Sequence, residues 1–341
     1  MISRRRLGAF LAGMLLCGLT AVACRPHPAP APAPGFYFWS TNFNFSDADA
    51  RLADSTGFRA LYLRLFDVDW DYNAGEATPR GRLSLPDTLP DLAAFDVTPV
   101  VFIVNRVFRE EAAPAELAQK VTGAINRATA KYPALAAAHR WQIDCDWTPG
   151  TRDAYFAFLR YLRQLHPERL LSVTVRLHQY RERANNGIPP AQEGLLMCYN
   201  FAPVGEAATD NAIFDPALLR GYLKAPPYPL PLNAALPTFE WGAAFRTGRF
   251  LGLTPVPDLL GTTPVGKNRF LLTADTTVAG KFLRAGDVIR YDGPQTAGNL
   301  RGAAALLRER PEINDLLFFD HQPELWRRYG VESLIDEFYR P

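Results

Sequence analysis

The sequence predicts an α/β fold in which eight parallel strands close into a (β/α)₈ TIM barrel. From Gly35 onward, short apolar runs alternate with helical patterns, as expected for parallel strands joined by helices. Eight such runs in a chain of 341 residues match the strand count and size of this barrel. An open doubly wound sheet is the main alternative, but its glycine-rich first turn is missing from FNFSD at residues 43–47.

The strands are expected where aromatic and β-branched residues gather, as in ALYLRLFDVDW and TPVVFIVNRVF. They cover residues 36–43, 60–70, 98–108, 140–147, 170–178, 194–200, 231–241 and 314–321. Helices are expected near 47–55, at 114–132 with Pro114 at its start, from a Thr151 cap to about His166, at 299–310 and at 324–339. The β-rich segment 249–293, after the seventh strand, predicts a small insertion on the barrel rim.

The first 34 residues predict a signal peptide followed by a tether. Three arginines at 4–6 precede an apolar run at 7–22, which has roughly the length of a signal peptide. The run ends in AVAC, which resembles a bacterial lipobox, so residues 1–23 are expected to be removed and Cys24 to carry lipid. Ordinary cleavage after Ala23, with Cys24 incidental, is the alternative. With Cys24, the Pro-Ala tract RPHPAPAPAP forms an extended tether over 24–34, about 30 Å long, and leaves 35–341 as the barrel domain.

Composition excludes several classes of partner. A formal charge of +2 gives no general electrostatic reason to bind nucleic acid. Four cysteines are too few for a disulfide scaffold; Cys145 and Cys198 are expected as buried free thiols, with pairing in an oxidising envelope as the alternative. Residues 261–268 nearly fit a P-loop, but end in Asn268 outside a strand-to-helix context, and the histidines lack a zinc spacing. We therefore expect no cofactor, no metal and a monomer.

Alternation along two strands places polar side chains inside the barrel. Alternate residues of a strand share a face, so the fourth strand turns apolar residues toward the helices and polar residues inward. The inward residues are Gln142, Asp144, Asp146 and Thr148 on the fourth strand, and Ser172, Thr174, Arg176 and His178 on the fifth. Buried charges must be paired, so a structural layer with Arg176 and Arg64 is one interpretation. We favour that role for deep Asp144, and a functional one for Asp146 near the C-terminal mouth, where barrel chemistry occurs.

Other chemically useful side chains end the remaining strands. They are Trp39, Asn42, Asp67, Asp69, Tyr199, Asn200, Glu240, Trp241, Asp320 and His321. Paired carboxyls perform glycoside hydrolysis, and aromatic faces can stack on sugar rings, although an aromatic residue taken alone is more often part of the core. The mouth therefore predicts a carbohydrate site.

The motifs at these strand ends resemble glycoside hydrolase family 18, the chitinase-like barrels. Residues 142–148, QIDCDWT, resemble that family's fourth-strand D-x-x-D-x-D-x-E, and 197–200, MCYN, resemble its sixth-strand M-x-Y-D. The segment LPTFEW at 236–241 resembles its seventh strand, after which many members carry an insertion. An uncharacterised bacterial family of barrel proteins with Q-x-D-x-D and L-P-x-[YF] strands resembles the chain more closely. Thr148 stands where family 18 has its catalytic Glu, Asn200 where it has Asp, and Trp141 replaces the first Asp.

The resemblance implies a glycosidase-like barrel that acts on or binds a glycan, and the N-terminal segment adds the expectation of an envelope lipoprotein. Without a Glu at 148, another carboxyl such as Glu240, Asp67 or Asp69 would have to supply the acid. The expected catalytic residues are Asp146, Glu240 and Asp144. The expected substrate contacts are Trp39, Asp67, Asp69, Arg176, His178, Tyr199, Asn200, Trp241 and Asp320. The alternative is a non-catalytic carbohydrate-binding or structural lipoprotein, anchored to the bacterial envelope and facing the periplasm or the cell surface.

Overall fold

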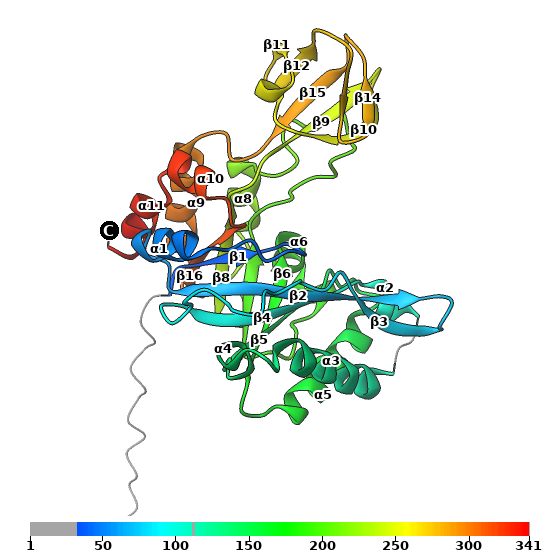
Figure 1. The fold of residues 1–341 in the computed structure, drawn as a ribbon, viewed down its shortest axis with the longest axis vertical. Coiled ribbons are helices and arrows are strands. Elements are labelled where there is room, and N and C mark those ends of the chain that lie inside the picture. The colour runs from blue at the N-terminus through cyan, green and yellow to red at the C-terminus, as the bar shows by residue number, and fades with distance from the viewer. Residues whose placement is uncertain (1–32, 111–112, 341) are drawn as a thin grey trace, which may run out of the picture. The chain divides into compact units, whose positions relative to one another are not determined.

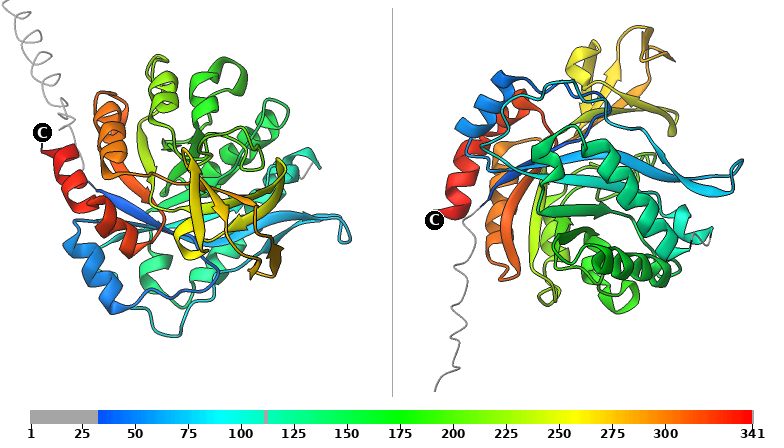
Figure 2. Two further views of the ribbon diagram at one scale, coloured as in Figure 1. Left: turned by 90° about the horizontal axis from the view of Figure 1, so that it is seen from above. Right: turned by 60° about the horizontal axis from the view of Figure 1, so that its bottom comes forward.

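The structure, a computed structural model, describes residues 33–110 and 113–340. Eight parallel strands close into a barrel, because β1 pairs with both β2 and β16 (Figure 2). In barrel order they are β1 (Gly35–Phe38), β2 (Ala60–Asp71), β4 (Asp96–Ile103), β5 (Arg140–Asp144), β6 (Leu170–Arg176), β7 (Glu193–Met197), β8 (Leu232–Pro237) and β16 (Ile313–Phe319). The predicted (β/α)₈ barrel is confirmed.

The helices lie outside the strands (Figure 1). They are α1 (Asp47–Ser55), α2 (Arg106–Arg109), α3 (Pro114–Thr129), α4 (Pro133–Ala136), α5 (Arg152–Leu165), α6 (Leu177–Arg181), α7 (Arg183–Asn186), α8 (Pro216–Tyr222), α9 (Ala297–Arg308), α10 (Pro323–Tyr329) and α11 (Val331–Tyr339). The single helix expected at 324–339 is two helices, because Gly330 adopts a left-handed φ of 62° that ends α10. Within the described ranges, no helix is long and apolar enough to cross a bilayer. The predicted leader, Cys24 and tether residues 24–32 lie outside the described residues.

Several strands end earlier than the sequence predicts. Strand β6 ends at Arg176, whose backbone N–H donates to the Gln179 side chain at 2.7 Å and so starts helix α6. His178 was expected to point inward from this strand, but it lies in α6 and is exposed. Alternate residues share a face only while the chain remains extended, so this period does not apply beyond Arg176.

Two β elements extend from the barrel. Strand β2 continues past the barrel and folds back as a hairpin with β3 (Glu76–Arg80), which the sequence analysis did not predict. The insertion after β8 forms a five-stranded antiparallel sheet from β9 (Trp241–Arg246), β10 (Arg249–Thr254), β11 (Thr262–Gly266), β12 (Arg269–Leu272) and β15 (Val288–Asp292). A short helix, η1 (Pro257–Leu259), and the pair β13 (Thr276–Val278) and β14 (Lys281–Leu283) complete it. Because Trp241 pairs with Asp292, this sheet starts before residue 249.

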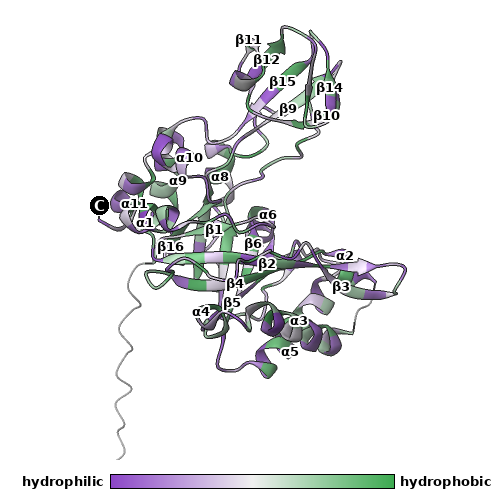
Figure 3. Ribbon diagram, in the orientation of Figure 1, coloured by the Kyte–Doolittle hydropathy of each residue, from purple (hydrophilic) through white to green (hydrophobic). Residues whose placement is uncertain are grey.

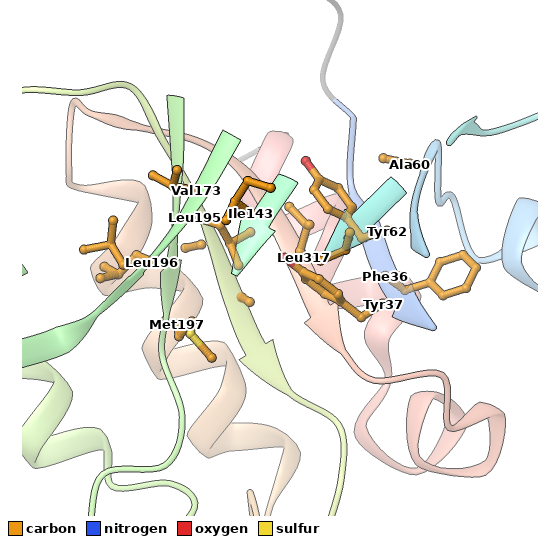
Figure 4. Close-up of a cluster of buried hydrophobic side chains, with 14 of the residues drawn as sticks. Phe36, Tyr37, Ala60, Tyr62, Ile143, Val173, Leu195, Leu196, Met197 and Leu317 are labelled. Carbon is orange, nitrogen blue, oxygen red and sulfur yellow. The ribbon is translucent and has the colours of Figure 1, made fainter. Parts of the chain in front are cut away.

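The barrel strands are apolar on most positions, and the helices are polar on their outer faces (Figure 3). Tyr37, Tyr62 and Leu317 come from three adjacent strands and pack together in the buried cluster of Figure 4. Inside the barrel, the Tyr37 hydroxyl on β1 donates to the Gln142 side chain on β5. This contact confirms that Gln142 points inward. Cys145 and Cys198 are both buried and unpaired, which confirms the free-thiol prediction.

A buried ion pair joins the insertion to the loop after β7. The Arg290 guanidinium contacts the Asp292 carboxylate at 2.7 and 2.9 Å, and both side chains are almost fully buried. The same guanidinium donates to the carbonyl oxygens of Val204 and Glu206 at 2.9 and 2.6 Å. Its five donors therefore satisfy a buried carboxylate and hold the 204–209 loop against the insertion.

We predict that Arg290→Met destabilises the protein by about 3–5 kcal/mol, because it leaves the Asp292 charge buried and unpaired. Urea unfolding followed by tryptophan fluorescence measures the loss. Arg249→Met is the matched control, since Arg249 is exposed, and should change the free energy of unfolding by less than about 0.5 kcal/mol. Equal effects of the two substitutions would contradict this role for Arg290.

Candidate functional site

Strand β5 ends on a buried carboxyl group. Asp144 is 6% exposed, and its Oδ1 accepts a hydrogen bond of 2.6 Å from the Thr174 hydroxyl on β6. Burial, followed by the negative charge of Asp146, raises the pKa of Asp144 to about 7, although the Thr174 hydrogen bond and Arg176 oppose the shift. Asp144 is therefore partly protonated near neutral pH, inside the barrel and close to its C-terminal mouth.

Asp146 lies two residues further along and is open to solvent. Its side chain is 46% exposed, and both oxygens accept from a single nitrogen, Nη1 of Arg176, at 2.9 and 3.0 Å. Arg176 is the last residue of β6, so the pair bridges the ends of two neighbouring strands. Burial lowers the pKa of Arg176, whereas the negative charge of Asp146 raises it. The net result is a pKa of Arg176 above its ordinary value. Of the pairings considered from the sequence, Asp146 with Arg176 is present, whereas Arg64 binds neither Asp144 nor Asp146.

Thr148 shapes the turn that leads into helix α5. Its backbone N–H donates to the Thr151 hydroxyl at 3.0 Å, and that hydroxyl donates to the Asn105 side chain at 2.6 Å. Thr151 occupies the predicted N-cap position, but its side chain makes no capping hydrogen bond. The exposed Thr148 hydroxyl cannot act as an acid of the carboxyl type, so this strand end lacks the proton donor that the resemblance leads one to expect.

Glu240 is held by three partners on the insertion side of the barrel. Its Oε1 accepts from Arg328 at 2.7 Å, and its Oε2 accepts from the hydroxyls of Tyr291 and Tyr329 at 2.6 and 3.1 Å. Its side chain is only 8% exposed. All of these partners lie on β15 and α10, and none is Asp144 or Asp146. Its predicted part in catalysis stays a prediction.

A cavity of about 820 Å³ lies beside this network. The insertion contributes Asp258 and Tyr291 to its lining, and α10 contributes Glu324 and Arg328. Asp144, Asp146 and Arg176 do not line this cavity, whereas Glu240 does. The three carboxyls expected to act together therefore do not share one cavity.

Asp67 and Asp69 lie at the base of the β2–β3 hairpin, and each is paired with an arginine. Asp67 accepts from Arg64 at 2.9 and 2.6 Å, and Asp69 accepts two hydrogen bonds from Arg106. The Arg106 hydrogen bond lowers the pKa of Asp69. Half-buried Trp39 packs beside this group, with its ring centroid 5.6 Å from the Arg64 guanidinium.

The ends of β6 and β7 surround a second cavity, of about 320 Å³. Arg176, His178, Tyr199 and Asn200 all line it, so four of the predicted substrate contacts lie together. The aromatic residues Phe201 and Tyr222 also line it and were not among the predicted contacts. Phe201 directly follows Asn200 in the chain, whereas Tyr222 comes from α8 and reaches the cavity only through the fold.

The last two predicted contacts are at the ends of other elements. Trp241 opens the insertion and donates from its indole N–H to Asp292 at 3.2 Å. Asp320 follows β16, and burial raises its pKa to about 6. Its Oδ1 is buried and has no hydrogen-bond partner among the described residues. Within those same residues, no group of three or more His, Cys, Asp or Glu side chains is arranged to hold a metal ion.

The sequence matches no family model and no curated protein. Solved structures nevertheless share its fold. A mutant GH18 chitinase from Cycas revoluta in complex with (GlcNAc)4 gives a TM-score of 0.55 at 12% identity, over 91% of this chain and 100% of that one. A chitinase from Bacteroides thetaiotaomicron gives 0.54 at 10% identity, over 90% and 96%. The spore cortex-lytic enzyme SleL from Bacillus cereus gives 0.52 at 13%, over 88% and 75%.

These similarities define the class of fold. The chain is a (β/α)₈ TIM barrel with extra β strands, and its fold is similar to that of these three solved structures. At 10–13% identity they establish the architecture, and the chemistry of the mouth must be argued from this chain's own residues.

We predict that stability falls with rising pH because of Asp144. Its folded pKa of about 7 lies above the ordinary value of 3.8, so protonation stabilises the fold fully below about pH 4. That contribution is lost as the pH rises through 7. Asp144→Asn cannot ionise, so the free energy of unfolding of the wild type, relative to this variant, should drop by a few kcal/mol between pH 4 and pH 8.

Urea unfolding of both proteins at several pH values measures this difference. Thr174→Val is a useful companion, because loss of its hydrogen bond to the carboxylate should raise the pKa of Asp144 and move the drop to higher pH. Parallel pH profiles for the wild type and Asp144→Asn would contradict the assignment.

Proposed function

We propose that the protein binds a glycan at the barrel mouth, in the cavity beside the Asp146–Arg176 pair. The observation that carries this proposal is the lining of that cavity. Tyr199, Phe201 and Tyr222 contribute aromatic side chains, and Arg176 and Asn200 contribute polar groups, to the lining of one space of about 320 Å³. Sugars present apolar ring faces and hydroxyl edges, so this combination suits them. The (GlcNAc)4 complex of the similar Cycas chitinase adds support.

Hydrolysis is the second candidate function. Two buried carboxyls favour it, because Asp144 and Asp320 have pKa values raised to about 7 and 6, within the range that suits proton transfer near neutral pH. Against it, Thr148 offers no carboxyl, and both oxygens of Glu240 are occupied. Binding without cleavage is therefore the better-supported function.

A glycan panel assayed for both binding and cleavage tests this choice. We expect calorimetric binding of a β-linked oligosaccharide with no released product. Asp146→Asn should weaken binding by about tenfold, because it removes the charge that orients Arg176. Glu240→Gln should leave the affinity within about twofold. Asp153→Asn on α5, an exposed aspartate, is the matched control and should change nothing.

Either of two results would reject the proposal. Absence of binding across the panel would remove the glycan function altogether. Cleavage that is abolished by Asp146→Asn would instead select the hydrolase, whereas cleavage surviving both substitutions would place the chemistry at other residues.

We also propose that the chain is a lipoprotein of the bacterial envelope, tethered through Cys24. The support is the sequence of residues 1–34, with its basic start, its apolar run and the Pro-Ala tract. Expressed in a bacterium, the full chain should fractionate with membranes and become extractable only by detergent. Cys24→Ser should release it into the soluble fraction, with Cys17→Ser as the control that does not. Continued membrane association of Cys24→Ser would overturn the lipid anchor.

A further inference from the structure

We propose that the glycan carries a carboxylate, and that Arg176 binds it through the edge formed by Nε and Nη2. This inference rests on the proposed glycan function and specifies its ligand. Asp146 uses only Nη1 of the guanidinium, which receives both of its oxygens. No described residue accepts a hydrogen bond from Nε or Nη2, although the side chain is only 25% exposed. A mostly buried cation therefore keeps two donors available beside the cavity.

The geometry of the available edge favours a carboxylate. Nε and Nη2 of an arginine point in parallel from one side of a planar group, and they match the two oxygens of a carboxylate. The ion pair with Asp146 fixes the guanidinium without consuming this edge. The backbone N–H of Arg176 is also fixed, by Gln179, so the residue is restrained at both ends. Such restraint lowers the entropic cost of binding.

The charges around the cavity also favour an acidic ligand. Arg176 lines it, and no aspartate or glutamate does. His178 adds little positive charge, because partial loss of solvent around its ring and then the charge of Arg176 lower its pKa below the ordinary value. The larger cavity beside Glu240 is the opposite case, since three carboxyls and one arginine line it. An acidic ligand is therefore better matched to the cavity at β6 and β7.

Asp146 limits how the carboxylate can approach. It is 46% exposed and negatively charged, so it repels an anion that comes from its own side of Arg176. The ligand carboxylate must therefore reach Arg176 from the cavity, which Tyr199 and Asn200 also line. An acidic group attached directly to a sugar ring, as in a uronic acid, would bring that ring into the cavity that Phe201 and Tyr222 line.

The test compares three tetrasaccharides by calorimetry with the chain lacking residues 1–23. The first alternates β-linked N-acetylglucosamine and glucuronate. The second is the same compound with its carboxyls reduced to alcohols, and the third is β-linked N-acetylglucosamine alone. The acid form should bind about tenfold more tightly than its reduced form, which is the contribution of about one charge-assisted hydrogen bond. This preference should shrink as salt is added.

Arg176→Lys keeps the positive charge for Asp146 but removes the planar edge, so the preference for the acid form should fall to about twofold. Arg160→Lys, on the exposed side of α5, is the matched control and should retain the tenfold preference. Circular dichroism and urea unfolding check that Arg176→Lys is folded; the acid-versus-reduced comparison in the wild type needs no variant.

The outcomes separate this inference from the function on which it rests. Equal binding of the acid and reduced forms by the wild type would overturn the carboxylate while leaving glycan binding intact. A preference that Arg176→Lys retains would also overturn it, by placing the carboxylate at another residue. Failure of all three sugars to bind would reject the glycan function and this inference together.

Discussion

The interior of the barrel must satisfy every polar side chain that β5 turns into it. A buried polar group without a partner is costly, so Gln142 and Asp144 can stay inside only because neighbouring and opposite strands supply partners. Tyr37 crosses from β1 to Gln142, and Thr174 reaches Asp144 from β6. These contacts require β1, β5 and β6 to keep one register. The closed barrel provides it, and the site at the mouth inherits its geometry.

The same requirement separates the two aspartates of β5. Asp144 and Asp146 lie two residues apart, and ionising both inside a poorly hydrated barrel would be unfavourable. Arg176 pairs with Asp146, the outer of the two aspartates, whose negative charge is also stabilised by solvent. The inner residue then holds its proton up to about pH 7. Two aspartates at the end of one strand thus differ in charge: Asp144 is largely neutral inside the barrel, and Asp146 is charged at its surface.

Much of the fold could be predicted from the sequence because its signals are local. Strand alternation placed Gln142 and Asp144 inside, and the helix expected near 47–55 is α1. Apart from the pairing of Asp146 with Arg176, side-chain partners could not be predicted, since they depend on distances set by the tertiary fold. Arg328 lies 88 residues from Glu240, and nothing in the sequence near either residue indicates their contact. The β2–β3 hairpin was missed because its second strand, EATPR, is short and polar.

The arrangement of carboxyls explains why binding fits this barrel better than hydrolysis. Hydrolysis of a glycosidic bond needs two carboxyls placed around one bond, one of them free to give up a proton. Here Asp146 is neutralised by Arg176, Glu240 supports the junction between the insertion and α10, and Asp67 supports the hairpin. Asp146, Glu240 and Asp67 are thus each held in an ion pair, whereas no described residue forms an ion pair with Asp144 or Asp320. What remains available at the mouth is the open donor edge of Arg176 beside the aromatic residues of the cavity, and this arrangement supports the proposed binding of a ligand.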